Sequence, residues 1–468
     1  MGPMALERHD LRFLVILFVV ALALRLIPIS LTTDMGIALD DMVQYDALAE
    51  SIRLGKGYTW YGGIPTAFRA PLYPLFLALI YSAVGHQFLA ARIVQAAVGA
   101  LLPLVVYVLG RRIFDSRVAV AAAWLMVFYP MFLVYPLALA TENLFFLLVP
   151  LTLLCLIRAM DTSRGSYYAL AGLLLALCIL TRSVISGFVV LLLTWLWYYI
   201  PKKRDALKNW GLILLPVAML TVPWSVRNSL LLGQFALVES SLGFNLYLGY
   251  HPDGTGTFDS DIAVDFIEGI GGFDAPGLGT EKLAHNLGME KGLAFIERDP
   301  ARAAWLLVSK LSHFLRLDKR AVLFFYSNNL LGELPNSILL LLLLIVCLPW
   351  VAVLLLSVVG MCFSDLSTDK ALIYLLCLYF IGIHVVIMSE PRFHLVLVPF
   401  LTIFAIQGAR TLPRAREVIG QPGARWRLAL CAAALSLVVL NWVYELNIDM
   451  DKLRVMFSPG GNTARFTY

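Results

Sequence analysis

The chain has 468 residues, of which 60% are hydrophobic and only 14% are charged, and its formal net charge is +5. With a mean hydropathy of +0.81, this composition excludes a soluble globular protein, because one core cannot bury so much apolar surface. Most Lys and Arg residues stand in short loops between apolar runs, where they orient membrane helices, so the charge does not indicate nucleic-acid binding. The six cysteines lie in or beside apolar runs without a CxxC pair, and they predict neither a disulfide framework nor a metal site.

Apolar runs of membrane-spanning length recur along the chain. A bilayer needs about 20 apolar residues per helix, and we expect an all-α membrane protein with about eleven such helices. The first run, 11–29, follows a basic start and lacks a small-residue cleavage site, so we interpret it as a retained helix rather than a signal peptide. The other predicted spans are 88–110, 117–136, 140–158, 167–182, 184–200, 209–231, 337–360, 370–388, 393–409 and 427–446.

The run 71–84 has only about 14 apolar residues, fewer than a span requires, and we interpret it as an interfacial helix. With the N-terminus in the cytoplasm and this run not spanning, every strongly basic short loop lies on the cytoplasmic side. The long segments 30–87 and 232–336 and the C-terminal tail are then periplasmic. We accordingly divide the chain into an N-terminal catalytic module (1–231), a periplasmic loop (232–336) and C-terminal membrane helices with an outer tail (337–468).

Both outer segments contain amphipathic patterns. In the first, Met42, Tyr45, Leu48, Ala49 and Ile52 repeat at helical spacing, which predicts a helix on the membrane surface. In the second, the apolar residues from Trp305 to Leu315 alternate with cationic ones, which predicts a helix lying flat at the outer interface. The cationic residues of this stretch are Lys310, His313, Arg316, Lys319 and Arg320.

The ionisable residues of the predicted spans gather near the outer ends. A charge inside a bilayer is costly, so its depth is informative. A transporter needs polar groups near the midplane and interrupted helices, whereas an enzyme that acts on a lipid headgroup needs its charges at one interface. The distribution favours the enzyme; the residues are Arg25, Arg92, Glu142, Arg182, Arg227, Arg392 and Glu445.

Two acidic residues on the outer side are candidates for acid–base chemistry. Asp41 begins the surface helix and Glu142 opens the fourth span, so each is also explained as a first-turn carboxylate that stabilises its helix by about 1 kcal/mol. Asp40 is the better helix cap of the two adjacent aspartates. The functional alternative makes Asp41 a general base, with Glu142 positioning an acceptor or binding a divalent ion.

Basic residues on the same side are candidates for phosphate binding. Arg69 precedes the interfacial helix, where a guanidinium can bind a phosphate bidentately; a side chain that only snorkels to the interface is the alternative. Arg392 follows Pro391, whose position at a helix start adds backbone N–H groups to a cationic site. His394 is equally explained as a hydrogen-bonded histidine without a chemical role.

Taken in order, these motifs resemble the GT-C glycosyltransferases, and more narrowly the protein mannosyltransferase and aminoarabinose transferase group. The resemblance covers residues 1 to about 410. It is carried by LDDMVQY (39–45), RAPLYP (69–74), Thr141-Glu142, LTR (180–182), PWSVRN (223–228) and RFH (392–394).

The resemblance implies a GT-C fold and inverting transfer of a sugar from a polyprenyl-phosphate donor to an acceptor on the periplasmic face of a bacterial inner membrane. It assigns the base to Asp41, four residues before Tyr45, and the second acidic role to Glu142. Many relatives have Asp-Glu where this chain has Asp41-Met42. The resemblance implies no required cofactor, and whether a divalent cation binds stays open. It places the donor phosphate at Arg69, Arg182, Arg227 and Arg392, and other substrate contacts at Asp40, Tyr45, Tyr73, Asn228, Glu390 and His394.

Three other classes stay open at this point. A lipid or glycan transporter would show the midplane polar groups that this sequence lacks. A catalytically inactive assembly subunit would not need the acidic and basic residues described above. A glycan ligase or polymerase of the cell envelope shares the outer-face chemistry, and substrate tests distinguish it.

Overall fold

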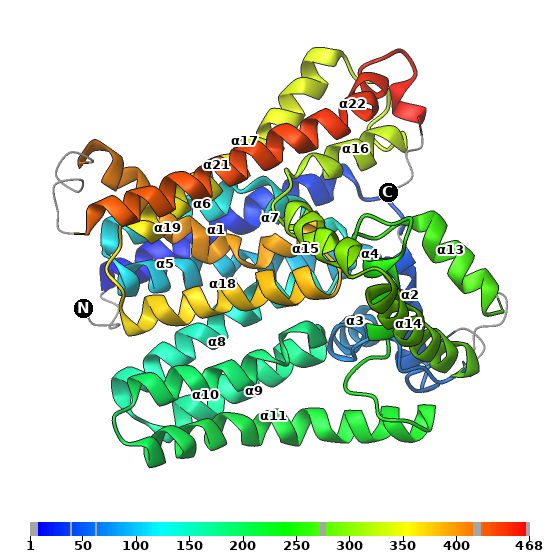
Figure 1. The fold of residues 1–468 in the computed structure, drawn as a ribbon, viewed down its shortest axis with the longest axis horizontal. Helices are drawn as coiled ribbons and strands as arrows, with labels where there is room; N and C mark the ends of the chain where they lie inside the picture. Colours follow the sequence, from blue (N-terminus) through cyan, green and yellow to red (C-terminus); the bar gives the residue numbers. More distant parts are fainter. Residues whose placement is uncertain (1–7, 38–39, 61–62, 272–277, 415–422, 465–468) are drawn as a thin grey trace.

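The computed structural model describes residues 8–37, 40–60, 63–271, 278–414 and 423–464. These residues form a bundle of helices (Figure 1). Within the described ranges there is no β-strand, and one isolated antiparallel bridge joins Thr59 to Pro65. The all-α prediction is confirmed.

The helices of the bundle coincide with the predicted spans. The N-terminal ones are α1 (Arg8–Leu31), α4 (Phe88–Ala100), α5 (Leu102–Ile113), α6 (Ser116–Phe128), α7 (Pro130–Val134), α8 (Glu142–Thr162), α9 (Gly165–Thr181), α10 (Phe188–Tyr199) and α11 (Lys203–Leu232). The C-terminal ones are α17 (Asn336–Cys362), α18 (Thr368–Val386), the 3-10 helix η4 (Pro391–Val396) leading into α19 (Val398–Thr411), and α21 (Ala424–Ile448).

Seven helices among the described residues are long and apolar enough to cross a membrane. An eighth follows if α6 and the segment Pro130–Leu137 form one span, bent by 53°. The bend has a local cause, because Tyr129 precedes Pro130 and takes an extended conformation instead of a helical one. The multi-pass membrane class is confirmed, whereas the count of eleven, which includes the shorter α9, α10 and α19, stays a prediction.

The remaining helices belong mainly to the two long outer segments. They are α2 (Asp40–Arg53), α3 (Leu72–Val84), α12 (Leu242–Tyr250), α13 (Ser260–Gly269), α14 (Leu278–Arg298), α15 (Pro300–Phe314), α16 (Lys319–Ser327) and, near the C-terminus, α22 (Met450–Met456). Figure 1 shows α2, α3, α13 and α14 together at one end of the bundle, opposite the end near the N-terminus. The two segments that the charge pattern placed on one side therefore do lie at one end.

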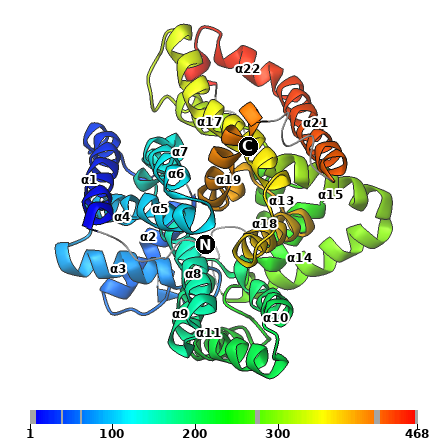
Figure 2. The same ribbon diagram turned by 90° about the vertical axis from the view of Figure 1, so that its left-hand side faces the viewer.

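Two helices on one side of the bundle pack in very close contact. Figure 2 looks along the bundle and shows α8, α9 and α11 on one side and α17, α19 and α21 on the other. The helices α17 and α19 approach so closely that a Cβ atom at Gly360 would lie 2.0 Å from the carbonyl oxygen of Phe404. A Cβ atom at Gly408 would lie 2.0 Å from the carbonyl oxygen of Leu356. Glycine permits this packing, as it does in membrane helix pairs generally.

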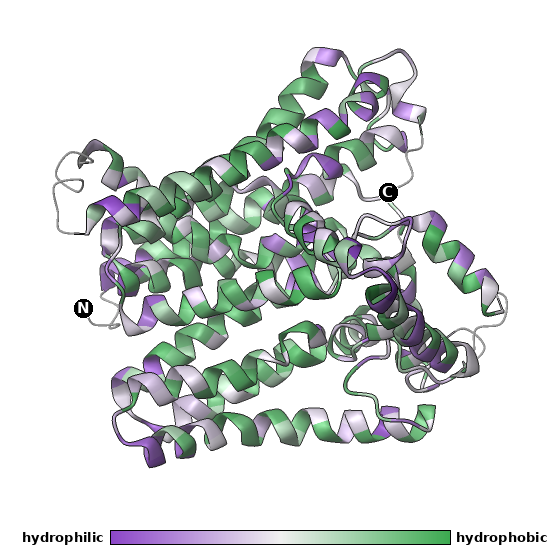
Figure 3. Ribbon diagram, in the orientation of Figure 1, coloured by the Kyte–Doolittle hydropathy of each residue, from purple (hydrophilic) through white to green (hydrophobic). Residues whose placement is uncertain are grey.

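Hydrophobic residues run along the bundle helices and hydrophilic residues gather at the ends (Figure 3). The amphipathic helix α15 departs from the expected arrangement, however. Its exposed side carries Trp305, Val308 and Leu311, which are 47%, 67% and 38% exposed, whereas Lys310 and His313 are buried. The helix was predicted correctly, but these two cationic residues face the protein interior.

Candidate active site

Asp41 and Arg69 meet because the first outer segment folds back on itself. Helices α2 and α3 pack together through apolar residues that include Tyr45 and Tyr73, whose ring centroids are 5.1 Å apart. Arg69 lies just before α3, donates from Nη2 to Asp41 Oδ1 and donates from Nε to Gln44 Oε1 at 2.8 Å. Its guanidinium also lies 5.4 Å from the centre of the Tyr45 ring. The arginine is thereby held in one orientation by a carboxylate, an amide and an aromatic face.

A second guanidinium reaches the same carboxylate from the C-terminal half of the chain. η4 begins at Pro391, as the sequence predicted, and places Arg392 Nη2 at 3.5 Å from Asp41 Oδ2. The side chains of Asp41 and Arg392 are 35% and 45% exposed. Two cations therefore flank one carboxylate that is open to the outside of the protein.

The charges around Asp41 set its protonation state. Burial raises the pKa of Asp41, but the positive charges of Arg69, Arg392 and Arg182 outweigh burial and lower it to about 2. Burial lowers the pKa of Arg392, while the charges of Asp41 and Glu142 raise it above its ordinary value. Asp41 is therefore ionised at neutral pH, and while its arginine partners stay in place it is a weak base.

Glu142 and Arg182 form a second acid–arginine pair beside the first. Glu142 is the first residue of α8 and is buried, and Arg182 follows the last residue of α9. Arg182 Nη1 lies 2.7 Å from Glu142 Oε1 and donates to Thr141 Oγ1 at 3.1 Å. Arg182 also lies over the ring of Phe393, with the guanidinium carbon 5.4 Å from the ring centre. The pair therefore borders η4, next to Arg392.

Arg227 and Asn228 contact the outer segments instead of the Asp41–Arg69 pair. Arg227 donates to the carbonyl oxygens of Thr66 (2.5 Å) and Tyr58 (3.2 Å) and to Asn228 Oδ1 (2.8 Å). Asn228 is fully buried and donates to the carbonyl oxygen of Val238 at 2.8 Å. The Arg227 bonds fasten the end of α11 to the first outer segment, and the Asn228 bond fastens it to the chain that follows α11.

The other predicted substrate contacts differ in their surroundings. Tyr73 is fully buried and donates to Gln95, whereas the buried Tyr45 lies directly beneath Arg69. His394 is also fully buried; its Nδ1 lies 3.0 Å from the carbonyl oxygen of Phe314, and its ring stacks on Trp350 at 3.8 Å. One ring nitrogen of His394 is thus hydrogen-bonded, as one of the two interpretations expects, and its chemical role stays untested.

Glu390 connects three segments at the start of η4. Its carboxylate accepts hydrogen bonds from the Thr257 hydroxyl and, at 2.8 Å, from the Phe258 backbone N–H, and it pairs with Arg320. It therefore orients η4 from behind Arg392. Asp40, also predicted to contact substrate, is the first residue of α2. The structure describes its backbone but not its side chain.

Two polar residues near the site were not identified from the sequence. Gln44 holds Arg69, as described above, and Glu239 accepts a hydrogen bond from Ser183 and adds negative charge near Arg69. Gln44 lies one turn after Asp41 on the same helix, so helical spacing was a usable signal. Glu239 lies in the connection between α11 and α12, where no periodic pattern points to it.

The carboxylates of the site do not fit a divalent cation as they are arranged. Such an ion takes several oxygen ligands of negative charge, but Asp41 and Glu142 are each occupied by arginine. Within the described part of the chain, no group of three or more His, Cys, Asp or Glu residues is placed to hold a metal.

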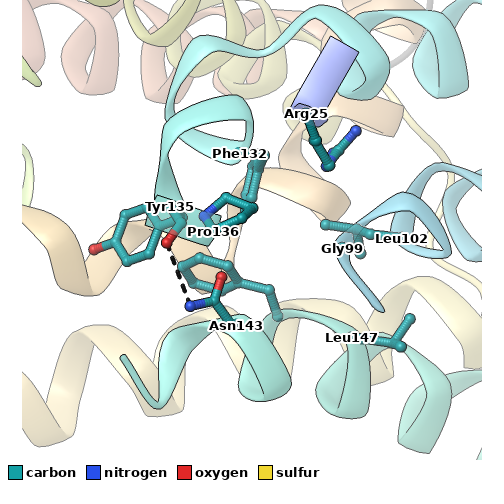
Figure 4. A pocket seen from close by; sticks show the side chains of 9 residues that line it. Arg25, Gly99, Leu102, Phe132, Tyr135, Pro136, Asn143 and Leu147 are labelled. Atoms are coloured by element: carbon teal, nitrogen blue, oxygen red, sulfur yellow. Dashed lines mark hydrogen bonds between the residues drawn. The ribbon is translucent and has the colours of Figure 1, made fainter. Parts of the chain in front are cut away.

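A small cavity lies behind the site, between α1, the α4–α5 junction and α8 (Figure 4). Its volume is about 10 Å³, room for one water molecule at most. Arg25 and Asn143 contribute to its lining, and Asn143 donates to the carbonyl oxygen of Tyr135 at 3.3 Å. This cavity is too small for a substrate.

Comparisons with known proteins agree with the family resemblance. Residues 68–226 match the sequence model of the dolichyl-phosphate-mannose-protein mannosyltransferases. This segment contains Arg69, Glu142 and Arg182, whereas Asp41 and Arg392 lie outside it. No curated protein sequence matches the chain.

Solved structures are similar to this chain at low sequence identity. The oligosaccharyltransferase of Archaeoglobus fulgidus in its apo form has a TM-score of 0.51 and 14% identity, covering 98% of this chain and 61% of that one. The same enzyme tethered to an acceptor peptide has a TM-score of 0.50 and 14% identity, covering 99% of this chain and 59% of that one. ArnT of Cupriavidus metallidurans bound to undecaprenyl phosphate has a TM-score of 0.40 and 14% identity, covering 87% of this chain and 78% of that one.

The chain thus spans about six-tenths of the length of the archaeal oligosaccharyltransferase. The matched segment and the shared arrangement of helices support the same assignment. The chain has the GT-C fold, and its residues 68–226 match the family of dolichyl-phosphate-mannose-protein mannosyltransferases.

Proposed function

We propose that the protein is an integral membrane glycosyltransferase that moves a sugar from a polyprenyl-phosphate donor to an acceptor on the periplasmic face, with inversion. The observation that carries this proposal is the convergence of Arg69 and Arg392, from opposite ends of the chain, on the half-buried carboxylate of Asp41. The family that matches residues 68–226 supports the proposal, because its description names a polyprenyl-phosphate-linked sugar.

The arrangement supplies what displacement at an anomeric carbon requires. A phosphate leaves readily when its negative charge is balanced, and Arg69 and Arg392 are two exposed or half-buried cations beside one another. Asp41 is the carboxylate that accepts the proton of the attacking hydroxyl. Direct attack on the face opposite the phosphate inverts the anomeric configuration and needs no nucleophilic side chain.

Donor binding has a consequence for the strength of the base. In the free protein the arginines hold the pKa of Asp41 at about 2, far below the value that suits a general base. A donor phosphate that takes Arg69 or Arg392 as its partner removes part of this positive influence, so the pKa of Asp41 rises. Asp41 then becomes an effective base only when the donor is in place.

The second pair has a supporting role in this mechanism. Glu142 is buried and held by Arg182 and the Thr141 hydroxyl, so it is less accessible to an acceptor than Asp41. We assign it to the positioning of Arg182 and, through the Phe393 contact, of η4. Positive charge at the donor phosphate comes from arginine in this proposal, and no divalent cation is needed.

The proposed orientation places the N-terminus in the cytoplasm and the C-terminus in the periplasm of a bacterial inner membrane. The basic short loops support this orientation through the positive-inside rule. The acceptor is a lipid, an envelope glycan or a protein, and it approaches from the periplasmic end where α2 and α14 lie. The division into modules 1–231, 232–336 and 337–468 remains our interpretation.

Binding of the donor lipid phosphate tests the proposal directly. We expect Arg69→Ala to weaken binding of undecaprenyl phosphate by the purified full chain about tenfold or more, because a charge-assisted pair is lost. Arg69→Lys should weaken lipid binding less than Arg69→Ala, because lysine keeps the positive charge but loses the bidentate geometry of the guanidinium. The matched control is Arg53→Ala on α2, whose partner is Glu50. Unchanged binding by Arg69→Ala would contradict the donor site.

A further inference from the structure

A second cavity lies in the periplasmic loop, apart from the Asp41 site. Its volume is about 150 Å³, fifteen times that of the cavity at Arg25. It lies where α14 ends and α15 begins, and α12 supplies part of its wall. Its lining includes Tyr250, Phe295, Arg298, Asp299, Arg302 and Leu306.

The lining combines aromatic faces with opposite charges. Tyr250 and Phe295 supply rings, while Arg298 and Arg302 bring two positive charges against the single negative charge of Asp299. Asp299 is committed locally, because its Oδ1 caps α15 by accepting from the Arg302 backbone N–H at 2.9 Å. The cavity therefore presents a net positive charge beside flat apolar surfaces.

Both arginines retain donors for a ligand. Arg302 donates from Nη2 to the carbonyl oxygen of Gly254 at 2.8 Å, and this bond fixes its position. Its Nε is buried and has no hydrogen-bond partner among the residues that the structure describes. Arg298 is exposed at the rim.

The cavity is connected to the Asp41 site through backbone contacts. The Tyr250 hydroxyl donates to the carbonyl oxygen of Val386 at 2.8 Å, and the Ser389 N–H donates to the carbonyl oxygen of Gly256 at 3.1 Å. The segment that leaves the cavity thus runs beside the residues that lead into η4 and Arg392. A ligand in the cavity would be held at a fixed place relative to the candidate active site.

We propose that this cavity is a subsite for an acidic pyranose unit of the acceptor, one that carries a carboxylate or a phosphate group. A cavity of about 150 Å³ accommodates a six-membered ring. The aromatic residues pack against the apolar face of the ring, and the arginines bind the anionic group bidentately. As an acceptor site the proposal rests on the proposed glycosyl transfer, but binding of the sugar does not.

Monosaccharide binding by the full chain tests the subsite. The protein is placed in phosphatidylcholine nanodiscs, because sugar-headed detergents would compete, and it is titrated with glucuronic acid, glucose 6-phosphate and glucose while saturation-transfer NMR is recorded. We expect at least one of the two acids to bind about tenfold more tightly than glucose, and the stronger acid identifies the anionic group. Equal affinity for all three sugars, or no binding by any of them, would overturn the proposal.

Variants locate the binding in this cavity. Arg298→Gln removes a charge at the rim of the cavity. Among the described residues, the Arg298 side chain makes no bond to a backbone carbonyl of the kind that Arg302 makes to Gly254. We therefore expect Arg298→Gln to leave folding intact and to weaken binding of the acid about tenfold. Arg454→Gln, at an exposed arginine paired with Asp451, is the matched control. Unaltered binding by Arg298→Gln and by Arg302→Gln would place the sugar elsewhere and refute the subsite.

Transfer kinetics separate this proposal from the proposed function. With an acidic acceptor, Arg298→Gln should raise KM for the acceptor about tenfold and leave kcat unchanged. If Arg298→Gln has no effect while Asp41→Asn abolishes transfer, the subsite is wrong and the transferase stands. If the acid binds in an Arg298-dependent way but Asp41→Asn still transfers normally, the subsite stands and the assigned base is wrong.

Discussion

Replacing Asp41 by Asn should nearly abolish sugar transfer while leaving the protein folded. The substitution keeps the shape of the side chain and removes the group that accepts the proton, and loss of a general base lowers turnover by about 100-fold to 10,000-fold. The structural cost is small, because the side chain is 35% exposed and a pair of this kind contributes about 1 kcal/mol or less. Activity and stability should therefore change very differently.

The assay for this prediction compares three purified proteins. Wild type, Asp41→Asn and Asp40→Asn are prepared with donor lipid, each is shown to elute as a single folded species, and turnover is measured. Asp40→Asn changes the neighbouring carboxylate on the same helix and should have little effect on turnover, since a cap substitution alters stability by about 1 kcal/mol. Near-normal transfer by Asp41→Asn beside an inactive Asp40→Asn would show that the wrong aspartate has been assigned.

Three further predictions follow from the same geometry. Glu142→Gln should reduce turnover less than Asp41→Asn if it only holds Arg182, and an equal loss would show that the two carboxylates act as a unit. The loss of kcat at acid pH should occur at higher pH than the loss of kcat/KM for the donor, because donor binding raises the pKa of Asp41 from about 2. If both are lost at the same pH, donor binding does not change the pKa of Asp41. A cysteine at Ser163 should be shielded from an impermeant thiol reagent in intact cells while one at Gly256 is labelled, and the reverse pattern would overturn the topology.

Much of the helical architecture was predictable from the sequence, for physical reasons. A bilayer demands long apolar runs, and these runs locate the helices whether or not their neighbours are known. Local signals also predicted the start of α8 at Glu142 and the start of η4 at Pro391. The number of complete spans was less predictable, because α9 and α10 are shorter than a typical span and α6 and α7 meet at a bend.

The contacts of the site were only partly predictable. Asp41 and Arg392 are separated by 351 residues in the chain, and no periodic pattern reports that they meet. Arg227 and Arg392 look alike in sequence, since each is an arginine near the outer end of a span. Their surroundings differ, because Arg227 donates to backbone carbonyls of the first outer segment, whereas Arg392 faces the half-buried carboxylate of Asp41. Such differences depend on the tertiary fold.

The burial of Lys310 shows the same limit within one helix. Helical spacing predicted an amphipathic α15, but it did not show which side faces the protein. In the structure the Lys310 ammonium lies 3.3 Å from the centre of the Tyr250 ring and donates to the carbonyl oxygen of Val386, also at 3.3 Å. An aromatic face and a carbonyl dipole thus replace water around this cation.

The most direct test of the central claim is the anomeric configuration of the product. The purified chain in nanodiscs is supplied with a polyprenyl-phosphate sugar of known anomeric configuration and with candidate acceptors, and the new glycosidic bond is examined by NMR. We predict a product of opposite configuration to the donor, formed by the wild type and lost in Asp41→Asn. A product that retains the donor configuration, or one that Asp41→Asn forms at the wild-type rate, would contradict single displacement with Asp41 as the base.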